Sequence, residues 1–564
     1  MNEFNCSYEH LKFDEACVNV ILDNNNYNMW LYSLSTDCVS CPYKRIARIS
    51  TNDNSSLKFS TVKTVKWRVL KNNGNNEYIS AKNTSDIFCE LSPNLGQYGL
   101  YELTVQNDTC SCKTLRKPTY PYSELFIILG IIIFILSAIS IGRSLWYKFT
   151  KQYVTKTEEE RTPNNNEKAT KHRRVKAIDT FRGVCTLFMI FVNDGSGSYT
   201  TLGHATWNGM LLGDLVFPCF MWIMGVCVPI ALSAQLKRGL SKLEISFSIF
   251  KRSFLLFLIG IALNTLGTNA QLENIRIFGV LQRFGITYLI VSLLYLCFTP
   301  QQPKVAQNLS QTWMTHKMQD ILSLLPHWCI MLTLVMVHCA VTFCLPIPGC
   351  PTGYLGPGGR HEDGKYFNCT GGATGYIDRI LLTLSHIYQW PTIDSIYGSG
   401  PFDPEGILGC LTSIFQVFLG VHTGVILMMY KGWKERIIRW LVWAVFYGCL
   451  GCIFHFTNII PINKNLWSLS FVLVSTCFAL AFLSGCYLLI DVVRIWRGGP
   501  FRIPGMNALM LFVGHNICYQ IFPFHWKIGT MDNRALRLIE SIWVVTLWTI
   551  IAYVMHRKRI YVTL

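Results

Sequence analysis

Long apolar runs dominate the chain after residue 123 and set the strongest constraint on its fold. From Glu124 to the C-terminus, runs of about 20 apolar residues alternate with polar connectors, and a helix of that length crosses a hydrocarbon core of about 30 Å. A backbone inside lipid must satisfy its own hydrogen bonds, so only helices and closed barrels span a bilayer. These runs do not alternate apolar with polar residues as barrel strands do. The sequence therefore predicts a polytopic α-helical membrane protein.

We predict about eleven transmembrane helices, so the two ends of the chain should lie on opposite sides of the bilayer. The expected spans are 125–147, 180–195, 209–235, 250–267, 277–298, 321–345, 405–430, 437–455, 466–490, 503–522 and 537–556. The predicted domains are a polar head at 1–123, a first transmembrane helix at 124–148, a basic loop at 149–178 and a ten-helix domain at 179–564 with a long loop at 346–404.

The distribution of Lys and Arg predicts the orientation. The formal net charge of +17 is concentrated in one set of connectors, and basic connectors stay in the cytosol. This set comprises 148–178, 237–252, 431–439, 494–502 and the C-terminal "HRKR". The head and the loop 346–404 should therefore face a lumen or the outside. The basic residues do not form a stripe with aromatic residues on a soluble domain, so we expect no nucleic-acid partner.

Cysteines and glycosylation sequons support this orientation. Sequons occur at Asn5, Asn54, Asn83, Asn107 and Asn368, all on the predicted lumenal side, and a further one at Asn308 falls in a predicted cytosolic connector. The head cysteines are Cys6, Cys17, Cys38, Cys41, Cys89, Cys110 and Cys112, and the long loop has Cys350 and Cys369. In an oxidising compartment these favour disulfides over metal ligation. Because seven is odd, a bridge between the head and the loop is plausible.

The head is predicted to be a small β-sandwich. "TVKWRV" alternates Val65, Trp67 and Val69 with charged residues, and "YELTVQ" alternates in the same way. This period of two, with β-branched and aromatic residues, is typical of half-buried strands. The opening "MNEFNCSYEH" has no apolar segment of a signal peptide. We therefore expect that a leader was removed or omitted.

Polar residues inside or beside the spans are candidates for function, because an ionisable group at membrane depth is costly. They are Asp179, Arg182, Asn193, Asp194, His204, Asp214, Arg276, Gln282, Arg283, Asp403, Glu405, Asn507, His515 and Asn516. Several come close to the lumenal ends of their predicted spans, which indicates one polar site near the lumenal face. His204 stands out because it lies in the glycine-rich stretch "NDGSGSYTTLGHATWNG" between two spans. Irregular backbone at that depth needs protein or water to cover it.

Histidine is the usual general base near neutral pH and can also be a nucleophile in acyl transfer. A nearby asparagine such as Asn193 could orient the ring or donate to an oxyanion. Other candidates have structural alternatives. Asp403, followed by a proline, could cap the seventh helix. Asp214 could pair with a neighbouring helix, Arg182 could reach lipid headgroups, and His515 could be a satisfied core histidine.

The cytosolic ends of the spans carry cations that could hold phosphates. They are Lys237, Arg238, Lys251, Arg252, Arg494, Arg497 and Arg502. Each is also explained as an ordinary basic residue on the cytosolic side. Phosphate binding on one face and a histidine on the other would suit a long phosphorylated donor such as a coenzyme A thioester.

Six segments resemble one family. The stretch "RVKAIDTFRGVCTLFMIFVNDGSGSYTTLGHATWNGMLLGDLVFPCFMWIMG" is similar to the signature block of the heparan-α-glucosaminide N-acetyltransferases. Further matches, in the family's order, are "IRIFGVLQRFGITYLIV", "FDPEGILGCLTSIFQVFLG", "INKNLWSLSFVL", "PGMNALMLFVGHNI" and "FPFHW". The family's active-site histidine falls on His204 and its neighbouring asparagine on Asn193. "NDGSG" departs from the family's glycine-richer pattern, which leaves Asp194 without a predicted role.

The resemblance implies a homodimeric enzyme of the lysosomal membrane without a metal. It would transfer acetyl from cytosolic acetyl-CoA to the terminal, non-reducing glucosamine of heparan sulfate in the lumen, through an acetyl-histidine or a ternary complex. We expect the donor to be bound by Arg182, Arg238, Lys251, Arg252, Arg497 and Arg502. We expect the acceptor to meet Asp403, Glu405, Gln282, Arg283 and His515. The alternatives are a secondary transporter, which often shows an internal repeat that we do not find here, and a sugar-binding receptor.

Overall fold

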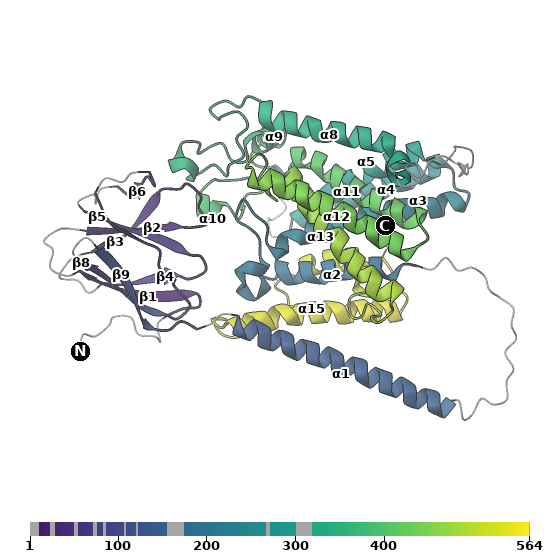
Figure 1. Ribbon diagram of the computed structural model, residues 1–564, viewed down its shortest axis with the longest axis horizontal. Helices are drawn as coiled ribbons and strands as arrows, with labels where there is room; N and C mark the ends of the chain where they lie inside the picture. Colours follow the sequence, from purple (N-terminus) through teal and green to yellow (C-terminus); the bar gives the residue numbers. More distant parts are fainter. Residues whose placement is uncertain are drawn as a thin grey trace.

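The protein has a β-rich head at one end of a large helical bundle (Figure 1). The computed structural model describes residues 11–22, 29–49, 55–71, 76–82, 86–106, 109–119, 122–154, 174–266, 271–299 and 318–562. The sequons at Asn5, Asn54, Asn83, Asn107 and Asn308, Cys6 and much of the basic loop 149–178 lie outside these residues. Asn368 is described, and it is exposed.

The head consists of two packed sheets, as predicted. The strands are β1 (Glu15–Leu22), β2 (Met29–Ser35), β3 (Tyr43–Ile49), β4 (Ser55–Ser60), β5 (Val65–Lys71), β6 (Tyr78–Ile79), β7 (Ile87–Leu91), β8 (Leu100–Gln106) and β9 (Thr109–Arg116). One sheet has the order β4-β1-β8-β9 and the other β6-β3-β2-β5-β7. Strands β1 and β8 pair in parallel, and the other pairs are antiparallel.

The alternation in the strands places one face of each in the space between the sheets. Trp67 and Val69 of β5 and Leu103 of β8 are buried in this shared core. In β5 the opposite face is covered as well, because Leu70 packs in a second cluster with Tyr32. The prediction of half-buried strands is thus confirmed for β8 and is only partly correct for β5.

The described residues after β9 are mainly helical, with irregular connections between the helices. The main helices are α1 (Ser123–Val154), α2 (Lys176–Asn193), α3 (Val216–Lys237), α4 (Lys242–Asn264), α5 (Val280–Phe298), α8 (Leu325–Cys344), α11 (Ile407–Met429), α12 (Trp433–Phe456), α13 (Leu469–Tyr487), α14 (Ala508–Ile517) and α15 (Arg534–Arg557). Shorter helices are α7 (Gln319–Leu322), α9 (Gly372–Leu382) and α10 (Asp394–Tyr397). Figure 1 shows α1 at the outside of the bundle beside α15.

Eight helices in the described residues are long and apolar enough to cross a membrane. They are α3, α4, α5, α8, α11, α12, α13 and α15, with α3 and α13 counted together with the turns next to them. Helix α2 has Lys176, Asp179 and Arg182 in its first two turns, and α14 has only ten residues. A polytopic helical membrane protein is therefore confirmed, whereas the count of eleven spans stays a prediction.

Helices α3 and α11 cross at the centre of the bundle with their backbones in contact. A Cβ atom at Gly225 would come within 1.9 Å of the Val417 carbonyl oxygen, and one at Gly420 within 2.0 Å of the Trp222 carbonyl oxygen. Small residues at such a crossing let two membrane helices approach closely. Almost every residue of α11 is buried. These two helices form the rigid centre around which the candidate site is built.

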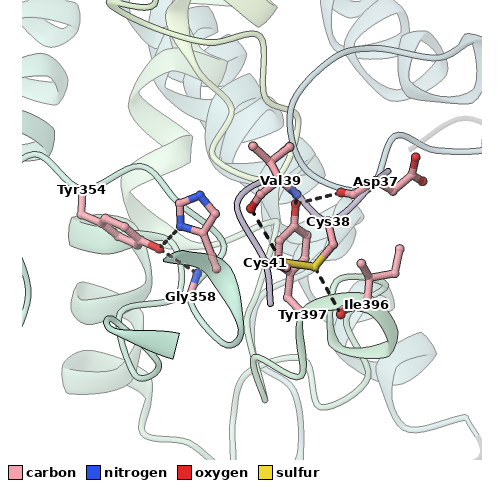
Figure 2. Close-up of a disulfide and its surroundings, with 9 residues drawn as sticks. Asp37, Cys38, Val39, Cys41, Tyr354, Gly358, Ile396 and Tyr397 are labelled. Carbon is pink, nitrogen blue, oxygen red and sulfur yellow. Dashed lines mark hydrogen bonds between the residues drawn. A yellow bond between two sulfur atoms is a disulfide. The ribbon is translucent and has the colours of Figure 1, made fainter. Parts of the chain in front are cut away.

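The head is docked on the bundle through the connection between β2 and β3. Figure 2 shows the disulfide between Cys38 and Cys41 in this connection. The backbone N–H of Val39 donates to the Tyr397 hydroxyl at 3.2 Å, and that hydroxyl donates to the Asp37 carbonyl at 2.9 Å. The disulfide packs in one buried cluster with residues of the bundle, namely Trp207, Ile393, Tyr397, Phe402 and Leu466.

The other bridges correct one prediction. Cys89 pairs with Cys110 within the head, and Cys350 pairs with Cys369 within the long loop. A bridge between the head and this loop is therefore wrong, since both loop cysteines are used in the loop itself. Hydrogen bonds hold the two segments together instead, among them those of Tyr397 with Val39 and Asp37 and that of Ser80 with Asp363.

Candidate active site

The His204 segment is irregular backbone between α2 and α3. It consists of single 3₁₀ turns at Ser196–Ser198, Thr200–Leu202 and Leu212–Leu215, with a connection of bends between the last two. Gly209 has a φ of +101°, which an L-residue with a side chain rarely adopts. The chain folds back here so that residue 204 comes next to residue 214.

His204 is held by Asp214. Nδ1 of the ring lies 2.9 Å from Oδ1 of Asp214, and Oδ2 accepts the backbone N–H groups of Ala205 at 3.0 Å and Leu211 at 2.9 Å. The carboxylate is completely buried. Because a carboxylate only accepts, the ring must carry its hydrogen on Nδ1. This leaves Nε2, which has no hydrogen-bond partner among the described residues, as the basic atom of the ring.

His204 borders a long internal cavity of about 530 Å³. Helix α3 lines it from Val216 to Gln235, and these 19 residue steps correspond to about 28 Å along the helix axis. The cavity therefore extends over most of the thickness of a hydrocarbon core. Its lining is apolar in the middle, with Phe220, Met224 and other side chains.

Polar side chains gather at the two ends of this cavity. At the end that faces the head, which we call the head end, His204, Asn193, Glu405 and Lys464 border it. The other polar lining residues, Arg182, Gln235, Ser248 and Arg252, lie further from the head, and we call this part of the cavity the far end. The structure thus brings together residues that the sequence places far apart.

The far end contains two of the six predicted donor-binding cations. Arg182 donates to Asp179 at 2.6 Å, and that carboxylate is shared with Arg174. The guanidinium of Arg252 lies 4.6 Å from the centre of the Tyr288 ring. The remaining four do not border the cavity. They are Arg238, Lys251 and Arg497, which are exposed, and Arg502, which is partly buried.

Asn193 is paired with His515 rather than with His204. Its side-chain nitrogen lies 2.9 Å from Nε2 of His515. Asn193 borders the cavity, while His515 is buried behind it. The residue that orients the catalytic candidate is therefore Asp214, and the expectation that an asparagine could do so is wrong for this geometry.

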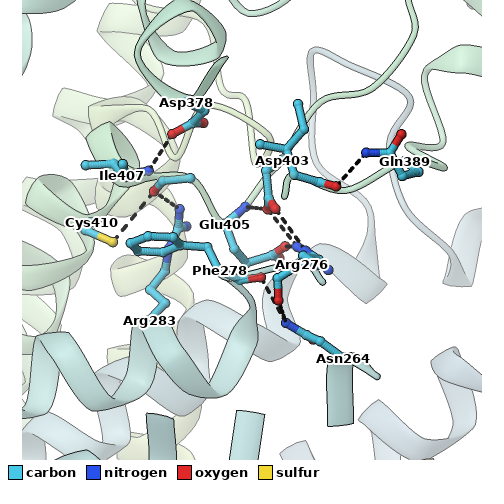
Figure 3. Close-up of polar contacts among 12 residues, drawn as sticks. Asn264, Arg276, Phe278, Arg283, Asp378, Gln389, Asp403, Glu405, Ile407 and Cys410 are labelled. Atoms are coloured by element: carbon cyan, nitrogen blue, oxygen red, sulfur yellow. Dashed lines mark hydrogen bonds and ion pairs between the residues drawn. The ribbon is translucent and has the colours of Figure 1, made fainter. Parts of the chain in front are cut away.

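The carboxylates predicted to meet the acceptor are bound to Arg276 (Figure 3). Nε and Nη2 of Arg276 lie 2.9 and 2.6 Å from the two carboxylate oxygens of Asp403, and Nη2 also contacts Glu405. Glu405 borders the cavity, whereas Asp403 is completely buried outside its lining. Burial alone would raise the pKa of Glu405, but the charges of Arg276, Arg283 and Lys464 together outweigh this and hold the pKa below its usual range.

The suggestion that Asp403 caps the seventh helix is wrong. Helix α11 begins at Ile407, and its backbone N–H donates to Asp378 at 2.9 Å. Asp378 comes from α9 in the long loop, where burial raises its pKa to about 7. Asp403 instead accepts the backbone N–H of Glu405 at 3.0 Å.

Two further predicted acceptor residues lie behind the cavity wall. Arg283 donates to the Gly406 carbonyl at 2.9 Å, and its guanidinium lies 4.9 Å from the Trp467 ring centre. Gln282 is completely buried against Gly260. Neither residue borders the cavity. No group of three or more His, Cys, Asp or Glu side chains that could hold a metal occurs in the described part of the chain.

Two contributions were missed by reasoning from the sequence. Lys464 was not singled out, although it lies in the segment "INKNLWSLSFVL". Asp214 was among the candidates for function, with pairing to a neighbouring helix as the alternative, but its contact with His204 was not predicted. In the structure both contact the ring of His204. The available signal was that both lie in segments with family resemblance.

The fold and the site together define an integral membrane protein with a histidine–carboxylate pair at one end of a long cavity and two arginines further along it. The family model described as the catalytic region of heparan-α-glucosaminide N-acetyltransferase matches residues 174–335. The heparan-α-glucosaminide N-acetyltransferase of Mus musculus is 35% identical over 594 aligned residues, which cover 98% of this chain and 89% of the mouse protein. The Homo sapiens protein of that name is 34% identical, with coverages of 98% and 88%.

The chain therefore belongs to the heparan-α-glucosaminide N-acetyltransferase family. It is a membrane-bound N-acetyltransferase. The family model covers His204, Asp214, Arg182 and Arg252, and it ends before Glu405 and Lys464.

Proposed function

We propose that this protein transfers acetyl from cytosolic acetyl-CoA to the terminal glucosamine amine of heparan sulfate in the lysosomal lumen. The observation that carries the proposal is the single cavity with His204 at its head end and two arginines at its far end. The names of the mouse and human relatives contain this acceptor and this reaction. The head end faces the lumen in this proposal, and the protein acts as a homodimer.

The far end supplies the donor site. Guanidinium groups bind phosphates with paired, charge-assisted hydrogen bonds, and Arg182 and Arg252 are the cations that border the cavity there. The apolar middle suits the uncharged arm of coenzyme A. A donor bound in this way presents its thioester towards the head end.

The acceptor amine meets Nε2 of His204 at the head end. In an acidic lumen the amine is an ammonium ion, so it must lose a proton before its nitrogen can attack. Nε2 accepts that proton, the nitrogen forms a bond to the acetyl carbon, and the bond between carbon and sulfur breaks. The leaving thiolate then takes a proton and departs as coenzyme A. Glu405 is placed to attract the ammonium form, since it is an anion at the cavity wall.

An acetyl-histidine route would use the same atoms in a different order. Nε2 would first attack the thioester, and the amine would then attack the acetyl-imidazole. Both routes need Nε2 without a hydrogen, and the contact with Asp214 supports this because it holds the hydrogen of the neutral ring on Nδ1. The side-chain amide of Asn193 borders the cavity and could donate to the oxyanion in either route.

The test uses the purified full chain in detergent with labelled acetyl-CoA and glucosamine. Product formed without any compartment establishes acetyl transfer on these substrates. His204→Ala should reduce the rate by about 10²-fold or more and leave acetyl-CoA binding intact, because the arginines lie at the other end of the cavity. His556→Ala at the end of α15, where the ring contacts Tyr561, is the matched control. Near wild-type turnover of His204→Ala would refute the assignment.

A further inference from the structure

Lys464 is fixed against the His204 segment by its own neighbours in the chain. The connection between α12 and α13 runs along this segment, and the Gly209 backbone N–H donates to the Ile462 carbonyl at 2.8 Å. On one side of Lys464, the Asn463 amide donates to Asn208 at 3.1 Å. On the other side, Asn465 donates to the Thr206 carbonyl at 3.4 Å. Lys464 is therefore held in place and is not a mobile surface lysine.

Its ammonium group contacts both members of the histidine–carboxylate pair. Nζ lies 3.1 Å from Nδ1 of His204 and 3.4 Å from Oδ1 of Asp214. Because Nδ1 gives its hydrogen to Asp214, the ammonium cannot donate to that nitrogen and instead interacts with the carboxylate. The Asp214 side chain is completely buried and the Lys464 side chain is only 20% exposed, so water screens the attraction between these two charges weakly, whereas the His204 side chain is 36% exposed.

The charge of this three-residue cluster depends on the ring. With a neutral His204, the anion Asp214 and the cation Lys464 sum to zero. With a protonated ring, the cluster carries one net positive charge, and the ammonium group of Lys464 repels the imidazolium at close range, which is unfavourable. In a pair of histidine and carboxylate without a lysine, the protonated ring is the favoured form, because the carboxylate stabilises the imidazolium. Lys464 thus opposes the effect that Asp214 would have by itself.

The other charged groups that face this cluster are themselves paired. Glu405 borders the same end of the cavity and is bound to Arg276, which also holds Asp403. On the head, Asp37 and Lys63 form an ion pair at 2.8 Å. Both of these side chains contact the Thr206 hydroxyl, two residues from His204. Lys464 is the cation that touches the ring.

We propose that Lys464 is a positioning residue for acetyl transfer: its ammonium group offsets the charge of Asp214 and opposes a second positive charge on the ring of His204, which keeps Nε2 available as a base. This inference rests on the proposed role of His204. It predicts that an enzyme without this cation works only at higher pH, although its fold and its substrate contacts are unchanged.

The experiment measures the pH profile of kcat/KM for acetyl transfer from acetyl-CoA to glucosamine, with the purified full chain in detergent. Lys464→Met should move the acidic limb of the profile upward by about one to two pH units. Activity near about pH 5 then falls at least about 10-fold, while activity near about pH 7.5 stays within about 3-fold of wild type. Lys464→Arg keeps the charge and should keep the wild-type profile.

Two controls make the outcomes distinct. Lys365→Met removes an exposed lysine from the long loop and should not move the profile. His204→Ala in the same assay tests the proposed function separately. If His204→Ala is inactive and Lys464→Met loses activity equally at all pH values, or keeps the wild-type profile, the inference about Lys464 is wrong and the role of His204 stands. If Lys464→Met does not fold, Lys464→Gln provides the second neutral variant.

Discussion

Asp214→Asn tests the arrangement of the candidate site most directly. An asparagine has the size of the aspartate but offers only one acceptor oxygen. That oxygen is needed by the backbone N–H groups of Ala205 and Leu211, which Oδ2 now accepts. The side-chain NH₂ would then face Nδ1 of His204, and two hydrogen-bond donors, the amide N–H and the ring N–H, would point at each other. The ring can relieve this only by carrying its hydrogen on Nε2.

The expected magnitude follows from the loss of the base. With its hydrogen on Nε2, the ring points a donor into the cavity and cannot take a proton from the amine. General-base catalysis contributes about 10²- to 10⁴-fold, and the same exchange in a serine protease triad costs about 10⁴-fold in kcat through the wrong tautomer. We therefore expect kcat to fall by about 10³-fold, which corresponds to about 4 kcal/mol in the barrier. The affinity for acetyl-CoA should not change.

The assay is steady-state transfer from labelled acetyl-CoA, together with the thermal unfolding midpoint of each purified variant. Asp394→Asn is the matched control, because this exposed aspartate also accepts a backbone N–H, from Gly400 at 3.1 Å, but lies outside the cavity lining. If Asp214→Asn kept kcat within about 10-fold of wild type, the orientation of His204 by Asp214 would not matter for catalysis, and the reasoning would be refuted.

Two other predictions concern the cavity and the long loop. Ala231→Trp places a large ring in the cavity lining and should raise the KM for acetyl-CoA at least about 10-fold, which corresponds to about 1.4 kcal/mol in binding free energy. Val445→Trp, on an exposed face of α12, is the control and should leave this KM unchanged. Titration of acetyl-CoA binding to each variant distinguishes the two outcomes. Burial raises the pKa of Asp378 from 3.8 to about 7. The protonated carboxyl therefore contributes its full stabilisation to the folded state below about pH 3.8. This contribution to the free energy of unfolding is lost as the pH rises through about 7, by up to about 4 kcal/mol. Asp378→Asn should therefore flatten the fall of the thermal unfolding midpoint between about pH 4 and pH 8, and an unchanged fall would contradict the assignment.

The positions of the long helices could be predicted because they depend on local composition. The expected span 277–298 corresponds to Val280–Phe298, and 405–430 corresponds to Ile407–Met429. The span predicted at 209–235 begins too early, since α3 starts at Val216. Residues 210–212 are apolar and favour a helix, but this stretch must turn so that Asp214 can meet His204. A tertiary contact of a charged group therefore outweighed the local preference.

The candidate site could be predicted only in part, because its contacts join distant segments. His204 was recognisable from polar residues between two apolar runs. Its contact with Lys464 spans 260 positions in the sequence, and no local pattern indicates such a pair. The same limit explains why Asp403 looked like a helix cap, while Asp378 from the long loop provides the acceptor instead.

In the proposed reaction, the division of polarity along the cavity would allow a charged donor to act across a bilayer. In the proposed reaction the phosphates stay at Arg182 and Arg252, and the amine stays at His204, so each charge remains near the end from which it entered. Only an uncharged arm and the acetyl group occupy the apolar middle. The reaction thereby avoids the free-energy cost of moving an ion through a medium of low dielectric constant. A carrier that moved the whole donor across the bilayer would incur this cost. The fixed α3–α11 crossing is compatible with this, because the acetyl group changes sides through chemistry and the helices need not exchange their access to the two faces.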